Sequence, residues 1–457
     1  MFLANAPAVG AAGAHLTTIE GHMGSALSTL ALALALLWAT PAAAADEEEL
    51  SFDVSEFETR AFEFGGYAEV WPEILDANPD GALYQLTFLD RDREDTIDRF
   101  KSALELEGRY HRDIFTLSFR THSDWVWDYR GSELDHSLYE GVMSLQPTTG
   151  FTVEAGKKAN RWGKGLVWNP VGFVERPKDP DDPNESREGF WMAGFDWIRS
   201  FQGPLRTLTI TPLIVPTLGD TNEDFGETGH VNPAAKLYLL YLDTDIDLLF
   251  LGNGSRTPRF GVDFAKNLAP NFEIHGEFAY ITDFERVEIT PSCRARRAPP
   301  EDVVSYLLGM RYRTDADVTY AVEYYYNEAG NSREQQERFF ECVHTAWEED
   351  DATLLAGLPL TSGSGRGPFT RPTPMRNYLH FRAFWNEPFD VLYFTPGLQA
   401  LYNLDDGSYS IAPELNYDGI DNVAIRLRAT FPVGDALTEW GEKLNNFKLD
   451  LRVRYFF

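Results

Sequence analysis

The stretch NFKLDLRVRYFF (446–457) alternates between two kinds of side chain almost without interruption. Its apolar members are Phe447, Leu449, Leu451, Val453, Tyr455 and Phe457. The charged residues between them are Lys448, Asp450, Arg452 and Arg454. Such period-two alternation is typical of a β-strand with two unlike faces. A strand of this kind suits either a soluble antiparallel sheet or the wall of a transmembrane β-barrel.

Similar alternating segments recur along the whole chain. The clearest are 102–110, 113–121, 151–157, 206–214, 259–266, 271–281, 303–313, 317–327, 377–385, 391–404, 409–417 and 422–431. Weaker ones are 61–71, 81–90, 136–146, 189–201, 234–242 and 245–251. Bacterial single-chain barrels have an even number of strands, so we omit 61–71 and expect about 18 strands, within a range of roughly 16–20.

The connections between these segments separate into two groups by length. Short turns are expected at 147–150, 202–205, 267–270, 314–317, 386–390 and 417–421. Long loops alternate with them at 123–135, 159–188, 216–233, 284–302, 328–375 and 432–445. Short turns on one side and long loops on the other are the signature of an outer-membrane barrel. We therefore predict an all-β fold, a transmembrane antiparallel up-and-down β-barrel over 81–457, after an N-terminal periplasmic segment at 46–80.

The N-terminal region carries an export signal by its composition. The apolar run 26–45 ends in Ala43, Ala44 and Ala45, which fits the small-residue pattern of a signal-peptidase site. We expect residues 1–45 to be a signal peptide, with Met1 or Met23 as the start; a membrane anchor is the alternative, but the run is short for one. The net charge of −31 argues against nucleic-acid binding. Together with the barrel pattern, this predicts the outer membrane of a Gram-negative bacterium.

If the apolar faces meet lipid, the other faces line the lumen. The basic lining residues would be Arg311, Arg313, His380, Arg382, Arg426, Arg428, Lys448, Arg452 and Arg454. Earlier strands contribute a largely acidic set: Glu105, Glu107, Asp263, Glu273 and Glu277, with Arg109 and His275 among them. Guanidinium groups suit carboxylate and phosphate, so a basic wall predicts the passage of anionic solutes. The alternative is that the two sets pair with each other, which would leave no net selectivity.

The loop 159–188 is the most distinctive connection in the chain, because it is long and rich in Trp, Asp and Pro. Its candidate constriction residues, with those at the preceding strand end, are Lys157, Lys158, Arg161, Trp162, Lys164 and Trp168. We expect this loop to fold into the pore; an ordered surface loop is the alternative. Its acidic residues Asp179, Asp181, Asp182 and Glu185 suit a hard cation, but the glycine pattern of a Ca²⁺ loop is missing.

Two further features of the sequence resemble known outer-membrane proteins. The run GKKANRWGKGLVWNP (156–170) followed by GFDWIRSF (194–201) resembles the alginate-export and related porin group of barrels. Here Lys157 and Lys158 stand where that group has an Arg-Gln pair, and the intervening loop is longer and more acidic. The resemblance implies passage of an anionic polymer or a small anion. The final Phe457 is similar to the signal by which the barrel-assembly machinery captures its clients.

The loop 328–375 contains a predicted helix over 332–350. Ser332 and Gln335 form a capping-box pattern, and apolar residues recur at helical spacing. The cysteines Cys293 and Cys342 both lie in long loops and would pair in an oxidising compartment; two unpaired thiols are the alternative. Neither cysteine has metal-ligand spacing.

The motifs of common enzymes are missing from the chain. There is no GxSxG, no HExxH and no phosphate-binding glycine loop. A Ser–His pair such as Ser305 or Ser410 with His380 is too unspecific to indicate a hydrolase. We predict a non-enzymatic porin or exporter without a cofactor or metal, whose partners are outer-membrane lipid and an anionic solute. A scaffold or surface-binding barrel with a plugged lumen is the alternative, and the pattern selects no oligomeric state.

Overall fold

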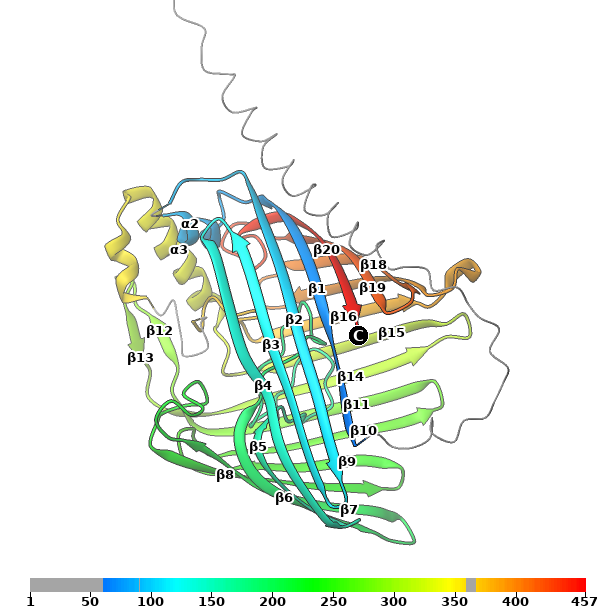
Figure 1. The fold of residues 1–457 in the computed structure, drawn as a ribbon. Coiled ribbons are helices and arrows are strands. Elements are labelled where there is room, and N and C mark those ends of the chain that lie inside the picture. Colours follow the sequence, from blue (N-terminus) through cyan, green and yellow to red (C-terminus); the bar gives the residue numbers. More distant parts are fainter. Residues whose placement is uncertain (1–60, 90, 359–366) are drawn as a thin grey trace, which may run out of the picture. The chain divides into compact units, whose positions relative to one another are not determined.

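Figure 1 shows the computed structural model, which describes residues 61–89, 91–358 and 367–457. The predicted signal peptide and residues 46–60 of the predicted periplasmic segment lie outside these residues. No helix in the described part of the chain is both long enough and apolar enough to cross a membrane.

Eighteen strands form one sheet. They are β1 (Phe62–Ala77), β2 (Thr96–Arg112), β3 (Phe115–Asp128), β4 (Gly131–Thr148), β5 (Phe151–Lys158), β6 (Phe190–Ser200), β7 (Leu205–Thr217), β8 (His230–Tyr241), β9 (Thr244–Leu251), β10 (Arg259–Ala269), β11 (Phe272–Phe284), β14 (Glu301–Arg313), β15 (Val318–Asn327), β16 (Asn377–Trp385), β17 (Phe394–Asn403), β18 (Tyr409–Ile420), β19 (Val423–Val433) and β20 (Asn445–Phe456). Each strand pairs antiparallel with the next along the chain, so the predicted up-and-down barrel of 18 strands is confirmed.

The barrel closes where the last strand meets the first. β20 pairs antiparallel with β1, and the register places Val453 opposite Val70. At the end of this seam Gly66 and Phe457 exchange two backbone hydrogen bonds of 3.2 and 3.1 Å. Closure pairs the backbone N–H and C=O groups of the first and last strands, which an open sheet would leave without partners.

The two faces of the wall differ as the alternation predicts. In β20, Leu449 is 36% exposed on the outer face, whereas Asp450 is 1% exposed on the inner face. Large apolar side chains are likewise exposed on other strands, for example Phe260, Leu308 and Leu398. The barrel therefore has an apolar exterior and a polar interior.

The position of the first strand corrects the prediction. The barrel begins at Phe62 and not at residue 81, because the omitted segment 61–71 belongs to β1. The retained segment 81–90 is instead the short helix α2 (Ala82–Phe88) in the connection between β1 and β2. Gly65, Gly66 and Pro72 weaken the strand pattern of β1, and a short apolar run is ambiguous between helix and strand.

The loop lengths follow the expected two groups, with one exception. The predicted long loop 123–135 lies mostly within β3 and β4, which are joined by residues 129–130 alone. The other long loops gather at one end of the barrel, here called the long-loop end. The opposite end carries the connections β2–β3, β4–β5 and their equivalents, and is called the short-turn end.

A small helical cap is built from several of the long loops (Figure 1). Helix α3 (Arg333–Glu349) begins after Ser332, whose side chain accepts from the amide of Gln335, so Ser332 is the predicted N-cap. The side chain of Gln335 does not complete a capping box but accepts from the amide of Ile289 at 2.7 Å. Phe339, Phe340 and Val343 of α3 are buried with Ala82 of α2. The cap also contains the hairpin of β12 (Val287–Ile289) and β13 (Ala295–Arg297) and the 3-10 helix η2 (Ala352–Gly357). Cys293 and Cys342 form a disulfide that ties the hairpin loop to α3.

Candidate functional site

The connection between β5 and β6 lies inside the barrel. Residues of this loop contact inward-facing side chains of β11 and β15 on one side and of β19 and β20 on the other. Because these strands belong to different arcs of a closed wall, the loop crosses the lumen. The sequence predicted such an inward loop at 159–188.

The first part of the loop is bound to the acidic arc, the name used here for the wall from β9 to β15 with its inward carboxylates. Glu277 accepts hydrogen bonds of 2.6 Å from each of the backbone amides of Lys164 and Gly165 and one of 3.3 Å from Val171. Glu323 accepts from the amides of Leu166 and Val167, the latter at 3.0 Å. Two buried carboxylates therefore hold five backbone amides in place.

A charged side chain and an apolar cluster complete this attachment. The ammonium of Lys164 lies 2.8 Å from Asp247 and 3.7 Å from Asp263. Trp168 stacks on Tyr325 with ring centroids 5.0 Å apart and packs in a buried cluster with Val167. Since Val167 and Trp168 are buried there, this part of the loop packs against its side of the wall.

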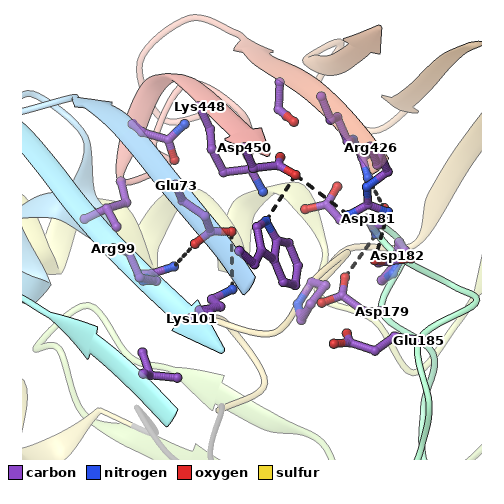
Figure 2. Close-up of a pocket in the computed structure, with 18 of the residues that line it drawn as sticks. Glu73, Arg99, Lys101, Asp179, Asp181, Asp182, Glu185, Arg426, Lys448 and Asp450 are labelled. Carbon is purple, nitrogen blue, oxygen red and sulfur yellow. Dashed lines mark hydrogen bonds and ion pairs between the residues drawn. The ribbon is translucent and has the colours of Figure 1, made fainter. Parts of the chain in front are cut away.

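The second part of the loop, residues 179–185, is called the acidic tip. It faces the basic arc, the name used here for the wall formed by β19, β20, β1 and β2. One carboxylate oxygen of Asp182 lies 3.1 Å from Nη1 of Arg426 and 2.8 Å from Nη1 of Arg452. Arg428 donates to the backbone carbonyl of Asp181. Gln399 donates to the carbonyl of Pro180 at 2.8 Å. Figure 2 shows the tip pointing at Arg426.

The basic arc carries acidic side chains of its own. Glu73 accepts from Arg99 at 3.2 Å and from Lys101 at 3.3 Å (Figure 2). Asp450 lies 3.7 Å from Arg426. Glu69 of β1 in turn pairs with two arginines of β20, Arg452 at 3.4 Å and Arg454 at 2.7 Å. The wall is therefore a lattice of alternating charges rather than a purely basic surface.

Trp71 lies at the centre of this lattice. Its indole nitrogen donates to Asp450 at 3.1 Å. The guanidinium of Arg452 lies 3.7 Å from a ring centroid of Trp71, and the ammonium of Lys101 lies at 4.1 Å. Cations over an aromatic face are attracted by its quadrupole, so Trp71 orients the basic side chains.

Two cavities flank the acidic tip. The larger, of about 530 Å³, reaches from Trp440 and Lys443 in the loop before β20 down to Arg454. The smaller, of about 370 Å³, reaches towards Asp418 at the short-turn end. Residues shared by both linings are Asp181, Asp182, Glu185, Arg426, Arg428 and Arg454. We call the two cavities and this shared region the arginine passage.

Most of the predicted basic lining residues are in this region. Arg426, Arg428, Arg452, Arg454, Arg382 and Lys448 line one cavity or both. His380 is fully buried in the wall beside Trp168. Arg311 and Arg313 lie elsewhere, half-exposed at the short-turn end, where they pair with Glu273 and Asp317 respectively.

The predicted constriction residues take other positions. None of Lys157, Lys158, Arg161, Trp162, Lys164 and Trp168 lines either cavity of the arginine passage. Lys157 pairs with Glu188, and Lys158 with Glu154. Trp162 is buried in an apolar core, and Arg161 is exposed. The acidic tip is instead the part of the loop that borders the passage. In the sequence, its acidic residues are considered only as ligands for a cation.

Residues missed from the sequence come mainly from the first two strands. Glu69, Trp71 and Glu73 belong to β1, which the strand count omitted. Arg99 and Lys101 precede the predicted strand 102–110, but β2 begins already at Thr96. Charged or polar residues alternate with apolar ones around residues 69–73 and 99–101, and this alternation is the sequence signal that could have identified these residues.

A titratable pair lies in the cap above the passage. His344 of α3 contacts Glu442 at 3.1 Å and Gln85 at 2.7 Å. The hydrogen bond to Glu442 raises the pKa of His344. Burial opposes ionisation of Glu442, but hydrogen bonds from His344 and from the amides of Leu437 and Ala82 lower its pKa overall. The charged pair joins α2, α3 and the loop before β20.

The fold and the inward loop together define a porin-like β-barrel. The chain is similar in fold to a triple mutant of the porin of Rhodopseudomonas blastica, with 11% identity over 87% of this chain and 100% of that one, at a TM-score of 0.43. It is also similar to OccK5 (OpdH) of Pseudomonas aeruginosa, with 10% identity over 86% of this chain and 98% of that one, at a TM-score of 0.49. No protein-family model and no curated protein sequence matches the chain.

Proposed function

We propose that this protein is an outer-membrane channel through which anionic solutes cross along the arginine passage. The observation that carries the proposal is the row formed by Arg426, Arg428 and Arg454, which both cavities share on either side of the acidic tip. A solute leaving one cavity meets the same arginines as it enters the other.

The membrane location is supported by the two faces of the wall. A closed antiparallel barrel satisfies every backbone hydrogen bond between strands, which is what a lipid environment requires. The exposed apolar side chains on its exterior, such as Phe260 and Leu308, would meet lipid. In this orientation the long-loop end is extracellular and the short-turn end is periplasmic.

The choice of anions is supported by guanidinium chemistry. Arg426 and Arg452 already bind a carboxylate, that of Asp182, so the passage accommodates a group of this kind. Guanidinium donors form a planar fork that matches carboxylate and phosphate oxygens. The proposed solutes are small anions or segments of an anionic polymer, as the sequence resemblance implies.

Assembly in the membrane is proposed to depend on the last strand. β20 carries the alternating apolar face and ends beside Phe457, whose backbone bonds to Gly66 complete the barrel. We propose that the barrel-assembly machinery recognises this strand. Export by the N-terminal signal of residues 1–45 would bring the chain to that machinery.

A scaffold barrel with a plugged lumen is the second candidate. It is favoured by the attachment of the loop to both walls, through Glu277 on one side and Arg452 on the other. In that case the charges of the two arcs serve only to hold the loop, and no solute crosses.

Swelling of liposomes that contain the purified barrel tests the proposal. We expect succinate to enter faster than its uncharged analogue succinamide, and the double variant Arg426→Ser/Arg452→Ser to reduce this difference. The matched control is Arg311→Ser/Arg313→Ser, which removes two arginines outside the passage. Liposomes that contain folded barrel but do not swell in either solute would favour the scaffold.

A further inference from the structure

The two walls of the barrel hold the inward loop by different kinds of interaction. On the acidic arc, the loop contributes backbone amides and the wall contributes the carboxylates of Glu277 and Glu323. On the basic arc, the loop contributes the carboxylate of Asp182 and the wall contributes arginines. In the first attachment the loop contributes neutral groups, whereas in the second it contributes a carboxylate, the group that an anionic solute also carries.

The negative charge and burial of the first attachment disfavour the entry of an anion. Its acceptors, Glu277 and Glu323, are 3% and 0% exposed and are themselves negative. The packing of Trp168 against Tyr325 also holds this part of the loop, and salt does not screen an apolar contact. This half of the loop therefore stays in place when the solution around it changes.

The second attachment presents the contacts of a solute-binding site. One carboxylate oxygen of Asp182 is shared between Nη1 of Arg426 and Nη1 of Arg452. Arg428 and Arg452 are buried, at 4% and 8% exposed, and within the described residues Nε of Arg428 and Nη2 of Arg452 have no hydrogen-bond partner. Buried donors that lack acceptors favour a further oxyanion oxygen.

We propose that Arg426, Arg428 and Arg452 form a binding site for the oxyanion group of a permeating solute, and that Asp182 is its resident occupant. A solute carboxylate or phosphate takes the place of Asp182 on the arginines. The acidic tip then moves from the wall while Glu277 and Glu323 keep the rest of the loop anchored, and the two cavities join. This inference rests on the proposed channel function and adds a residue that regulates it.

The neighbouring acid provides a matched comparison. Asp181 also borders both cavities, but Arg428 binds its backbone carbonyl, and within the described residues its carboxylate forms no ion pair. Asp181→Asn and Asp182→Asn each remove one negative charge from adjacent positions of the tip. A displaced carboxylate requires that Asp182→Asn changes solute binding much more than Asp181→Asn does, whereas a general field effect requires equal changes.

Single-channel recording with added succinate tests the site. We expect openings to increase with succinate and not with succinamide. In Asp182→Asn the half-saturating succinate concentration should fall about fivefold, because an ion pair of ordinary strength no longer competes. Asp181→Asn should lower it much less, and Asp182→Glu, which retains a carboxylate, should stay near the wild type. Inorganic phosphate in a parallel series shows which oxyanion source the site prefers.

Each failure has its own meaning in this experiment. Equal shifts in Asp181→Asn and Asp182→Asn, or openings that ignore succinate in a conducting wild type, would overturn the resident-carboxylate site and leave the channel standing. A folded wild type that never conducts would instead overturn the channel function. Heat-modifiable migration on gels establishes that each variant is a folded barrel before it is recorded.

Discussion

Asp182 and Arg426 lie 244 positions apart in the chain, yet a carboxylate oxygen of the first is 3.1 Å from a guanidinium nitrogen of the second. This ion pair links the tip of an inward loop to the far wall of the barrel. It stands beside Trp71 and between the two cavities, so that solute passage, loop position and wall charge depend on the same few groups.

The anchor on the acidic arc is expected to depend on Glu277. Glu277→Ala removes the acceptor of three backbone amides, and an amide left without a partner costs about 1–3 kcal/mol. Hydrogen exchange in residues 160–171 should therefore become at least about tenfold faster. The control is Glu285→Ala just after the same strand, which breaks a pair with Arg297 of the cap hairpin, away from the loop. Unchanged exchange in Glu277→Ala would contradict the anchor.

Trp71 is expected to support solute binding through the arginines it orients. Trp71→Leu removes the ring under Arg452 and Lys101 and the hydrogen bond to Asp450. The half-saturating succinate concentration in single-channel recordings should rise about threefold, which corresponds to a cation–π contact of ordinary strength. Trp125→Leu is the control, because Trp125 is 44% exposed on the outer face. Equal effects of the two substitutions would exclude this role of Trp71.

The cap is expected to be more stable at mildly acidic pH than at alkaline pH. The raised pKa of His344 means that its contribution is complete below about pH 6.5 and is lost as pH rises through the raised value. The lowered pKa of Glu442 means that its contribution is complete above about pH 4.3 and is lost only as pH falls through the lowered value. Between these limits both groups stabilise the cap.

Hydrogen exchange of the α3 amides, corrected for the intrinsic effect of pH, measures this contribution. The free energy of opening should be about 1 kcal/mol higher near pH 5.5 than near pH 9 in the wild type. In His344→Gln the difference should vanish, whereas His111→Gln, at an exposed histidine of β2, should retain it. A pH dependence that persists without His344 would assign it to another group.

The disulfide is expected to stabilise the cap and not the barrel. Cys293 and Cys342 join the β11–β14 loop to α3, 49 positions apart. A crosslink of this kind contributes about 2–4 kcal/mol, so Cys293→Ser/Cys342→Ser should make α3 more sensitive to limited proteolysis. The barrel should remain heat-resistant on gels, because its strand pairing does not involve either cysteine. Loss of the folded barrel in the double variant would contradict this division.

Much of the fold is predictable because the barrel repeats one local rule. Alternation in stretches such as 446–457, with the segregation of loop lengths, is enough for an antiparallel barrel of 18 strands. The predicted number of strands is correct although two segments were assigned wrongly, since β1 was omitted and α2 was counted as a strand. The rule that a barrel has an even number of strands limits how many strands there are, but it does not show which weakly alternating segment is a strand.

The site is less predictable because its partners are distant in the chain. Alternation places Arg426, Arg428 and Arg452 on the inner face, but it does not reveal that Asp182 meets them. The role of Trp71 depends on closure of the barrel, which brings β1 beside β20. Local pattern therefore identifies the wall, and only the closed fold shows what faces it.

The reversal potential of the purified barrel in a planar bilayer with a KCl gradient tests the central claim most directly. We expect steady channels whose reversal potential lies towards that of chloride, and a shift towards zero in Arg426→Ser/Arg428→Ser/Arg452→Ser. A barrel that inserts but stays silent, or a selectivity that the triple variant leaves unchanged, would contradict an anion path along these arginines.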